Sequence, residues 1–218
     1  EPTLTLDERH AVDFIIETLR REPAGTVTLC TLGPLTNIAT ALEKAPDIAG
    51  RVRELVMMGG GFFEGGNITP AAEFNIYVDP EAAAAVFQAG IPIVMMPLDV
   101  THKVLTLKSR VARLRDIGSR PAIALVEMLD FFERFDVEKY GSDGGPLHDP
   151  TVIAYLLKPE LFAGRDCNVV VGTASPLTSG MTVADWWQVT GRRHNARVMK
   201  DVDADGFFDL LPERVGRL

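Results

Sequence analysis

Short apolar runs alternate with amphipathic helical patterns through the N-terminal half of the chain, and this alternation limits the fold more than any other feature. The apolar runs are strand-like and cover residues 26–32, 54–61 and 91–99. Apolar residues recur with helical spacing over 7–22 and 35–42, and a proline-initiated helix is predicted from Pro80 to Gly90. Strands that alternate with helices through short connections form βαβ units. The sequence therefore predicts an α/β protein with a Rossmann-like, mostly parallel sheet and helices on both faces.

The remainder of the chain predicts helices, a loop and short strands. In order, these are a helical segment over 107–138, a glycine-rich loop over 141–150, a short buried helix over 151–159, short strands with a β-hairpin region, and a C-terminal helix over 203–218. Phe131, Phe132 and Phe135 favour core packing or an oligomer contact over a ligand cage. No repeat, low-complexity tract or linker divides the sequence, so one α/β domain is expected over residues 1–218.

Charge and hydropathy exclude several classes of partner. The 218 residues carry a net charge of −8, whereas nucleic acids and anionic membranes require a basic surface. No apolar run approaches the roughly 18 residues of a membrane-spanning helix. A neutral or cationic small ligand, or a metal ion, is the expected partner. Cys30 and Cys167 both lie in apolar runs and are expected to be buried thiols rather than a disulfide or metal ligands.

A polar cluster follows the second strand-like run. Asn67, Glu73 and Asn75 lie in an irregular segment just after three consecutive glycines. Because ligands of parallel sheets bind at the carboxyl ends of the strands, this position favours a binding site. Amide and carboxylate groups suit vicinal hydroxyls, which both donate and accept hydrogen bonds. Ordinary turn chemistry at the two asparagines is the alternative, and the local sequence leaves both open.

The tripeptide His148-Asp149-Pro150 opens a predicted helix and offers a second candidate site. Asp149 can be the N-cap of this helix, with Pro150 as its first residue. Alternatively, Asp149 is a hard oxygen ligand for Ca²⁺ or Mg²⁺. His148 is suited to exchange a proton near neutral pH. The local sequence does not decide between a cap and a ligand.

Four segments together carry a resemblance to a known family. They are LGPLTNIA (32–39), VMMGGGFFEGGNITPAAEFNIYVDPEAA (56–83), PLDVTH (97–102) and HDP (148–150). In this order they resemble the inosine–uridine-preferring nucleoside hydrolase family over almost the whole chain. The resemblance implies an enzyme that hydrolyses the N-glycosidic bond of ribonucleosides to ribose and free base, with one bound Ca²⁺. It further implies a small-molecule ribonucleoside partner, no nucleic acid or membrane partner, a homo-oligomer (dimer or tetramer), and a cytoplasmic role in nucleoside salvage.

The resemblance also assigns roles to individual residues. The resemblance implies two calcium ligands, the Leu32 carbonyl and Asp149. It implies four sugar contacts, which are Met58, Asn67, Glu73 and Asn75. His148 is the implied proton donor. A neutral nucleobase departs poorly as an anion, so His148 would protonate it as it leaves. The preference for purine or pyrimidine is left open, although His148 weakly favours a member that accepts inosine or uridine.

One element of the family pattern, an aspartate-rich DxDPGxDDA segment on the first strand, does not occur in this sequence. Its aspartates supply further Ca²⁺ ligands and the base that activates water. We therefore expect the chain to correspond to the C-terminal two thirds of a family member and to bind Ca²⁺ poorly. Another chain could supply the missing groups, or the chain is a non-catalytic nucleoside-binding protein or an inactive fragment with an exposed sheet edge. If other carboxylates of this chain complete the site, Asp99 is the first candidate.

Overall fold

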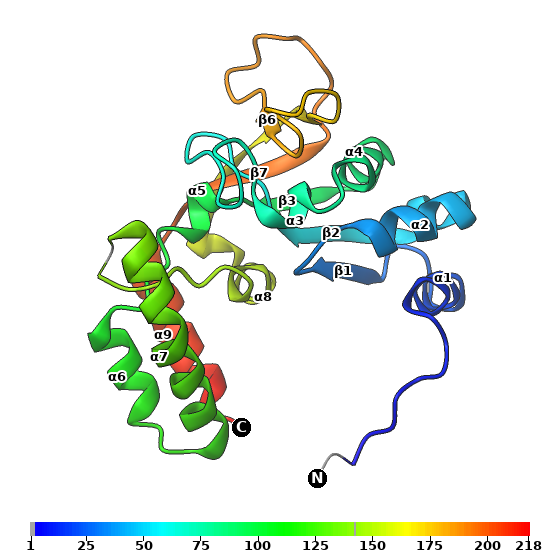
Figure 1. The fold of residues 1–218 in the computed structure, drawn as a ribbon. Coiled ribbons are helices and arrows are strands. Elements are labelled where there is room, and N and C mark those ends of the chain that lie inside the picture. The colour runs from blue at the N-terminus through cyan, green and yellow to red at the C-terminus, as the bar shows by residue number, and fades with distance from the viewer. Residues whose placement is uncertain (1–2, 142) are drawn as a thin grey trace.

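A five-stranded sheet with the order β1-β2-β3-β7-β4 forms the centre of the molecule (Figure 1). The computed structural model describes residues 3–141 and 143–218, without the side chains of residues 133–140, so Phe135 lies outside the described residues. The strands are β1 (Val27–Thr31), β2 (Val52–Met58), β3 (Ile93–Met96), β4 (Phe162–Cys167) and β7 (Ala196–Val202). The first three and β7 are parallel, and β4 is antiparallel to β7. The predicted α/β fold with a mostly parallel sheet is confirmed.

Helices lie on both faces of this sheet (Figure 1). One face is covered by α1 (Ala11–Arg21), α2 (Thr36–Lys44) and α4 (Pro80–Gln88), and the other by α5 (Leu98–Thr101), α8 (Pro150–Leu157) and α9 (Ala204–Val215). The apolar face predicted for the first helix is confirmed, because Val12, Ile16 and Leu19 of α1 are buried. Asp79 caps α4 by accepting a hydrogen bond from the Ala82 amide at 3.0 Å. No helix in the described part of the chain is long and apolar enough to cross a bilayer.

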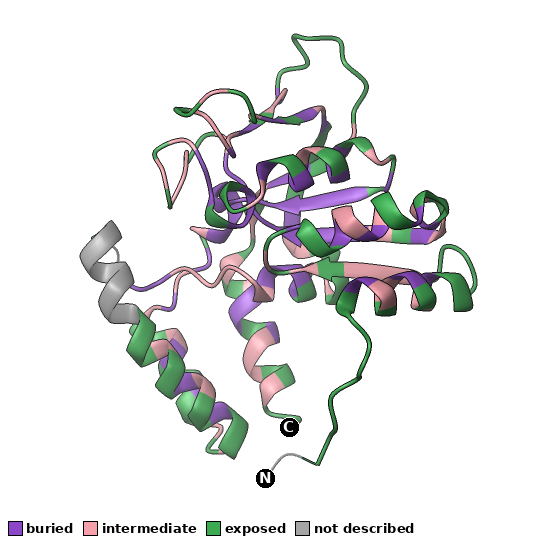
Figure 2. Cartoon of the chain, turned by 45° about the vertical axis from the view of Figure 1, so that its right-hand side comes forward, coloured by how far each residue is buried: buried purple, intermediate pink, exposed green. Residues whose placement is uncertain are grey.

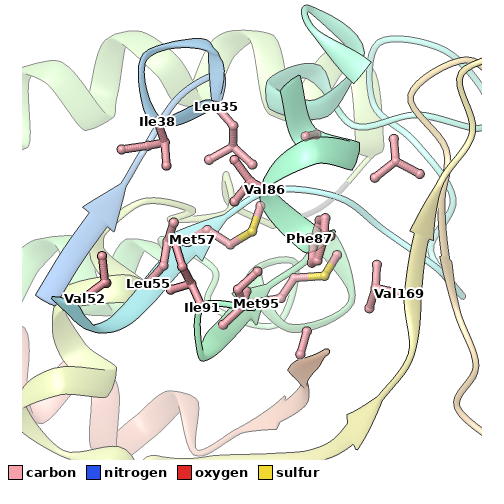
Figure 3. Packing of buried hydrophobic residues seen from close by; sticks show 14 of the residues in the cluster. Leu35, Ile38, Val52, Leu55, Met57, Val86, Phe87, Ile91, Met95 and Val169 are labelled. Atoms are coloured by element: carbon pink, nitrogen blue, oxygen red, sulfur yellow. The ribbon is translucent and has the colours of Figure 1, made fainter. Parts of the chain in front are cut away.

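The centre of β2 is buried on both faces, and this accounts for the continuous apolar run in its sequence. Leu55 and Met57 pack into one core cluster with α1, α2 and α4 (Figure 3), whereas Val56 and Met58 pack into a second with α8 and α9. A strand enclosed by helices on both faces carries apolar residues at successive rather than alternate positions. Burial is accordingly concentrated in the central strands (Figure 2). The carboxyl end of β2 is thereby held rigidly in the middle of the sheet.

The second half of the chain differs from the prediction in its details. The helical segment is divided into α6 (Lys108–Arg115) and α7 (Arg120–Tyr140). Gly118 lies between them with φ of +68°, a left-handed conformation that glycine adopts readily and that stops the first helix. The predicted hairpin is formed by β5 (Val169–Val171) and β6 (Thr182–Ala184). The strands β4 and β7, by contrast, join the main sheet through long-range pairing. The remaining short helices are α3 (Phe74–Tyr77) and the 3₁₀ turns Pro46–Arg51 and Pro159–Leu161.

The aromatic residues of α7 do not belong to the core. Phe131 is 51% exposed and Phe132 is 61% exposed. Their rings pack edge-to-face against each other with centroids 5.9 Å apart. Core packing is therefore wrong for these two residues, and the predicted oligomer contact stays a prediction.

The strand β1 is an edge strand, and among the described residues it pairs only with β2. Cys30, which was expected to be buried, is exposed on β1 because no described element covers that edge; Cys167 is buried as expected, and both are free thiols. Beside the end of β1, Leu32 is 44% exposed, and Ile153 and Leu157 of α8 are each 45% exposed. An unpaired strand edge next to exposed apolar side chains favours association with another polypeptide.

We expect the purified 218-residue chain to self-associate through this face. Replacing Ile153 and Leu157 together by glutamate should shift the chain toward monomer in sedimentation equilibrium, because two charges would have to be buried in the contact. The matched control replaces Leu177 and Val189, which are 85% and 83% exposed elsewhere, and should leave association unchanged. A monomeric wild-type chain, or equal effects of the two double variants, would contradict the expectation.

Candidate active site

The predicted site residues gather at the carboxyl ends of β1, β2 and β3, where loops meet the start of α8 (Figure 1). Met58 is the last residue of β2, and Leu32 directly follows β1. The polar segment continues from the glycine turn after β2 into α3. Parallel strands place all their carboxyl ends at one edge of the sheet, so these distant segments converge there.

Glu73, Asn75 and Met58 form one buried polar unit. The Glu73 side chain is 2% exposed, and its Oε2 accepts hydrogen bonds from the Gly60 amide at 2.9 Å and the Asn75 amide at 3.0 Å. The Asn75 side chain is 8% exposed, and its Nδ2 donates to the Met58 carbonyl at 3.1 Å. Glu73 is also the N-cap of α3. The structure therefore brings three of the four predicted sugar contacts together.

The glycine turn after β2 is held by the hairpin β5–β6. Gly60 has φ of +78°, and a Cβ atom at this position would lie 2.4 Å from the Met95 methyl group and 2.8 Å from the Thr182 hydroxyl. Thr182 Oγ1 accepts from the Gly61 amide at 3.0 Å and donates to the Gly61 carbonyl at 2.8 Å. Only glycine combines this backbone conformation with so close an approach. The turn presents the Gly60 amide to Glu73 as a consequence.

Asn67 supports the same unit from the preceding loop. It is half-buried, and its Oδ1 accepts a hydrogen bond from the Phe74 amide at 2.8 Å. The carbonyl side of its amide is therefore used to fix the start of α3, as the turn interpretation predicts. The bond ties Asn67 to the residue that follows Glu73 in the chain, so the binding interpretation stays compatible with the structure.

Asp149 occupies the N-cap position of α8, and Pro150 is the first residue of the helix, as the cap interpretation predicts. Its backbone is already helical, however, with φ of −62° and ψ of −38°, and its side chain makes no capping hydrogen bond. The position is therefore confirmed, whereas the side chain does not act as a cap. Burial raises the pKa of the Asp149 carboxyl. Burial also raises the pKa of Glu73, hydrogen bonds from the backbone of Asn75 and Gly60 act in the opposite direction, and the negative charge of Asp149 raises it further. Two carboxylates from distant parts of the chain thus lie within electrostatic reach of each other.

Leu32 and Asp149 line one cavity of about 320 Å³, together with Ile153 of α8 and Phe207 and Leu210 of α9. The two predicted calcium ligands are therefore neighbours at the open edge of the sheet. A larger cavity of about 770 Å³ lies at the opposite ends of β3 and β7 and contains none of the predicted residues. Among the described residues, no group of three or more histidine, cysteine, aspartate or glutamate side chains is placed to hold a metal ion.

His148 lies against α5. Its Nδ1 is 2.7 Å from the Thr101 hydroxyl, and its ring centroid is 5.7 Å from that of His102. The backbone of His148 is held separately, since Thr151 Oγ1 donates to its carbonyl at 2.6 Å. Thr101 could not be predicted from sequence as a contact of His148, because a threonine in a short helix carries no local signal of a histidine partner.

Asp99 supports the loop after the glycine turn. It is 3% exposed. Its Oδ2 accepts from the Phe62 amide at 2.9 Å, and its Oδ1 accepts from the Phe63 and Glu64 amides at 2.8 and 3.1 Å. Both oxygens are thus engaged by the loop after the glycine turn. This geometry gives Asp99 a structural task, and its role as a further calcium ligand stays a prediction.

The chain matches a protein-family model and curated relatives over nearly its whole length. The model described as "Inosine-uridine preferring nucleoside hydrolase" matches residues 1–209. Protein C1683.06c of Schizosaccharomyces pombe is 52% identical, covering 100% of this chain and 70% of its own length. The pyrimidine-specific ribonucleoside hydrolase RihA of Escherichia coli is 49% identical, covering 99% of this chain and 69% of its own length.

Solved structures are also similar. The purine-preferring ribonucleoside hydrolase from Gardnerella vaginalis superimposes with a TM-score of 0.89 at 31% identity, over 99% of this chain and 68% of that one. The inosine-uridine preferring nucleoside hydrolase from Bacillus anthracis gives a TM-score of 0.83 at 28% identity, over 100% of this chain and 68% of that one. RihA and the two solved structures are named as nucleoside hydrolases, which are enzymes. The sequence resemblance is thereby confirmed: the chain belongs to the inosine–uridine-preferring nucleoside hydrolase family.

Proposed function

We propose that this chain takes part in hydrolysis of the N-glycosidic bond of ribonucleosides, giving ribose and a free base, and that residues 1–218 act as one unit of that enzyme. The observation that carries the proposal is the convergence of Glu73, Asn75 and Met58 with His148 and Asp149 at one edge of the sheet. This arrangement supports a single site in which the first three residues bind the sugar, His148 donates a proton and Asp149 supplies a second carboxylate.

The ribose is held by Asn67, Glu73 and Asn75, with Met58 beside the ring. Glu73 can accept hydrogen bonds from two hydroxyls, and the asparagine amides both donate and accept. The backbone bonds that fix Glu73 and Asn75 exist without substrate, so little ordering is needed when the sugar binds. A buried carboxylate close to the ring also stabilises the positive charge of an oxocarbenium-like transition state.

His148 delivers a proton to the departing base. A purine or pyrimidine that leaves as an anion is a poor leaving group, and protonation removes that charge. The backbone of His148 is held beside the site by Thr151, whose hydroxyl donates to the His148 carbonyl at 2.6 Å. A histidine placed in this way is suited to act as general acid near neutral pH.

Asp149 and the Leu32 carbonyl would hold a Ca²⁺ ion. The oxygen chemistry fits: the Asp149 side chain does not cap α8, and burial disfavours its charged form, which a cation would stabilise. When bound, Ca²⁺ would act as a Lewis acid that polarises the attacking water and the ribose hydroxyls. Two donors are few for an ion that takes roughly six to eight oxygens. We therefore propose that further carboxylates complete the site in the active form of the enzyme.

Pyrimidine ribonucleosides are the proposed substrate class. The proposal rests on identity alone: the pyrimidine-specific RihA is 49% identical to this chain, whereas the purine-preferring enzyme from Gardnerella vaginalis is 31% identical. A higher kcat/KM for uridine than for inosine is the expected result in the active form. Equal values for the two nucleosides, or a preference for inosine, would contradict it.

A second candidate function is ribose or nucleoside binding without hydrolysis. It is favoured by the lack, among the described residues, of a metal-binding group of three or more side chains. It is also favoured because both carboxylate oxygens of Asp99 accept hydrogen bonds from backbone amides of the loop after the glycine turn. This candidate keeps the ribose contacts of Glu73 and Asn75 and lacks the base that activates water.

The ribose assignment is tested at Glu73 and Asn75. In the active form, Glu73→Gln and Asn75→Ala should each lower kcat/KM by about 100-fold or more, because buried groups lose their hydroxyl partners. The matched control is Glu81→Gln in the exposed first turn of α4, which should retain activity. Near wild-type kinetics for both site variants, with thermal unfolding unchanged, would remove the assignment.

The leaving-group assignment is tested at His148. His148→Ala should slow uridine hydrolysis by about 100-fold or more and p-nitrophenyl riboside hydrolysis far less, since p-nitrophenolate departs without a proton. His194→Ala, on the exposed loop before β7, is the control and should affect neither substrate. Equal slowing of both substrates by His148→Ala would show that the residue packs or positions and is not the acid.

The calcium assignment is tested on the 218-residue chain itself. Calorimetric titration should show Ca²⁺ binding with a dissociation constant on the order of 0.1–1 mM or weaker, because one carboxylate and one carbonyl leave most positions to water. Asp149→Asn should abolish the signal, and Asp143→Asn, an exposed acid of the same loop, should not. A reducing-sugar assay should detect no ribose. Tight binding with turnover would overturn this account and leave other carboxylates of the chain to complete the site.

A further inference from the structure

Thr101 makes a contact that the proposed mechanism does not yet use. It is the last residue of α5 and is fully buried, at 0% exposure. Its hydroxyl oxygen lies 2.7 Å from Nδ1 of His148. Its own amide donates to the Pro97 carbonyl at 3.1 Å, so its backbone is fixed by the helix. The hydroxyl is therefore presented to the histidine ring from a rigid support.

The contact determines which ring nitrogen can serve the substrate. A neutral imidazole carries its proton on either nitrogen, and the hydrogen bond made by one nitrogen sets the role of the other. Because Thr101 engages Nδ1, proton transfer from His148 to a leaving base has to run through Nε2. The hydroxyl oxygen can accept a hydrogen bond from a protonated Nδ1, so this bond can persist before and after the transfer of the Nε2 proton.

We infer that Thr101 is a positioning residue for His148: its hydroxyl fixes the ring orientation and the tautomer so that Nε2 faces the leaving group. The inference rests on the proposed role of His148 as the acid. In that step the Nε2 proton moves to the base as the C1′–N bond breaks and its electron pair passes to the base. Water adds to the ribosyl carbon and gives its proton to one of the carboxylates that complete the active form. His148, which starts the step doubly protonated, regains its Nε2 proton from solvent. Nδ1 keeps its proton throughout and donates it to Thr101 Oγ1.

The neighbouring residues support a division of tasks. Thr151 holds the backbone of His148, so the loss of Thr101 removes the restraint on the ring without removing that on the chain. His102 lies beside the ring and is itself 3.3 Å, through Nδ1, from Glu64 Oε2. Thr151 thus restrains the backbone and His102 lies beside the ring, but neither residue binds Nδ1 of His148.

The kinetic test compares Thr101→Val with Thr101→Ser in the active form. Valine has nearly the shape of threonine and lacks the hydroxyl, whereas serine retains it. We expect Thr101→Val to lower kcat for uridine by about 10- to 100-fold with little change in KM, and to leave p-nitrophenyl riboside hydrolysis within about 3-fold of wild type. Thr101→Ser should restore kcat for uridine to within about 3-fold. Equal slowing of both substrates, or wild-type kcat in Thr101→Val, would overturn the inference.

The spectroscopic test needs no activity and uses the 218-residue chain. Long-range ¹H–¹⁵N correlation should show His148 in a single tautomer in the wild type and in Thr101→Ser, and in a tautomer mixture in Thr101→Val. Thr106→Val is the matched control, since Thr106 is also buried and its hydroxyl donates to the Gly145 carbonyl at 2.9 Å instead. It should leave the His148 signals unchanged.

The two tests separate the inference from the function on which it rests. A tautomer mixture in the wild type would overturn the inference even if Thr101→Val fails to fold. So would identical His148 signals in the wild type and in a folded Thr101→Val. If His148→Ala shows no difference between the two substrates, the acid role fails. The tautomer measurement then still reports whether Thr101 fixes the ring.

Discussion

The buried carboxylate of Glu73 is the constraint around which the candidate site is built. A carboxylate that is 2% exposed is strongly unfavourable unless hydrogen bonds replace its lost hydration. Here the replacement comes from backbone amides of two elements, the glycine turn after β2 and the first turn of α3. The Gly60 amide reaches Glu73 from a left-handed turn directly after β2. The site therefore depends on where β2 ends, and the two helix layers bury that strand on both faces.

The short helix α5 joins the two halves of this site. At the start of α5, Asp99 accepts hydrogen bonds from three consecutive backbone amides of the loop after the glycine turn. At its end, Thr101 contacts the ring of His148. Both side chains are buried and neither is assigned to the substrate, so their task is to hold other groups in place. A segment of four residues thus positions the loop on the sugar side and the histidine on the base side relative to each other.

The parts of this structure that sequence could predict are those with local causes. The helix at Pro80 follows from a cap, a first-turn proline and a terminal glycine, and β2 follows from its continuous apolar run. The insertion of β7 between β3 and β4 has no such signal, because it depends on pairing between distant segments. The exposure of Cys30 likewise depends on which strand lies at the edge. For Asp149 the local sequence correctly predicts the N-cap position, but only the structure shows that its side chain makes no capping hydrogen bond.

The two donors proposed for Ca²⁺ differ from the sugar-binding groups in how they are supported. Glu73 and Asn75 are held by backbone contacts at the middle of the sheet, whereas Leu32 and Asp149 line a cavity beside the edge strand β1. The exposed apolar side chains of Ile153 and Leu157 lie on this same side. Covering that surface would remove water from the apolar residues and from the two oxygen donors at once. Burial without a counter-charge would raise the pKa of Asp149 still further, so whatever covers this edge has to bring a cation, or a proton, to the carboxylate. The apolar contact and the metal site are for this reason expected to form together.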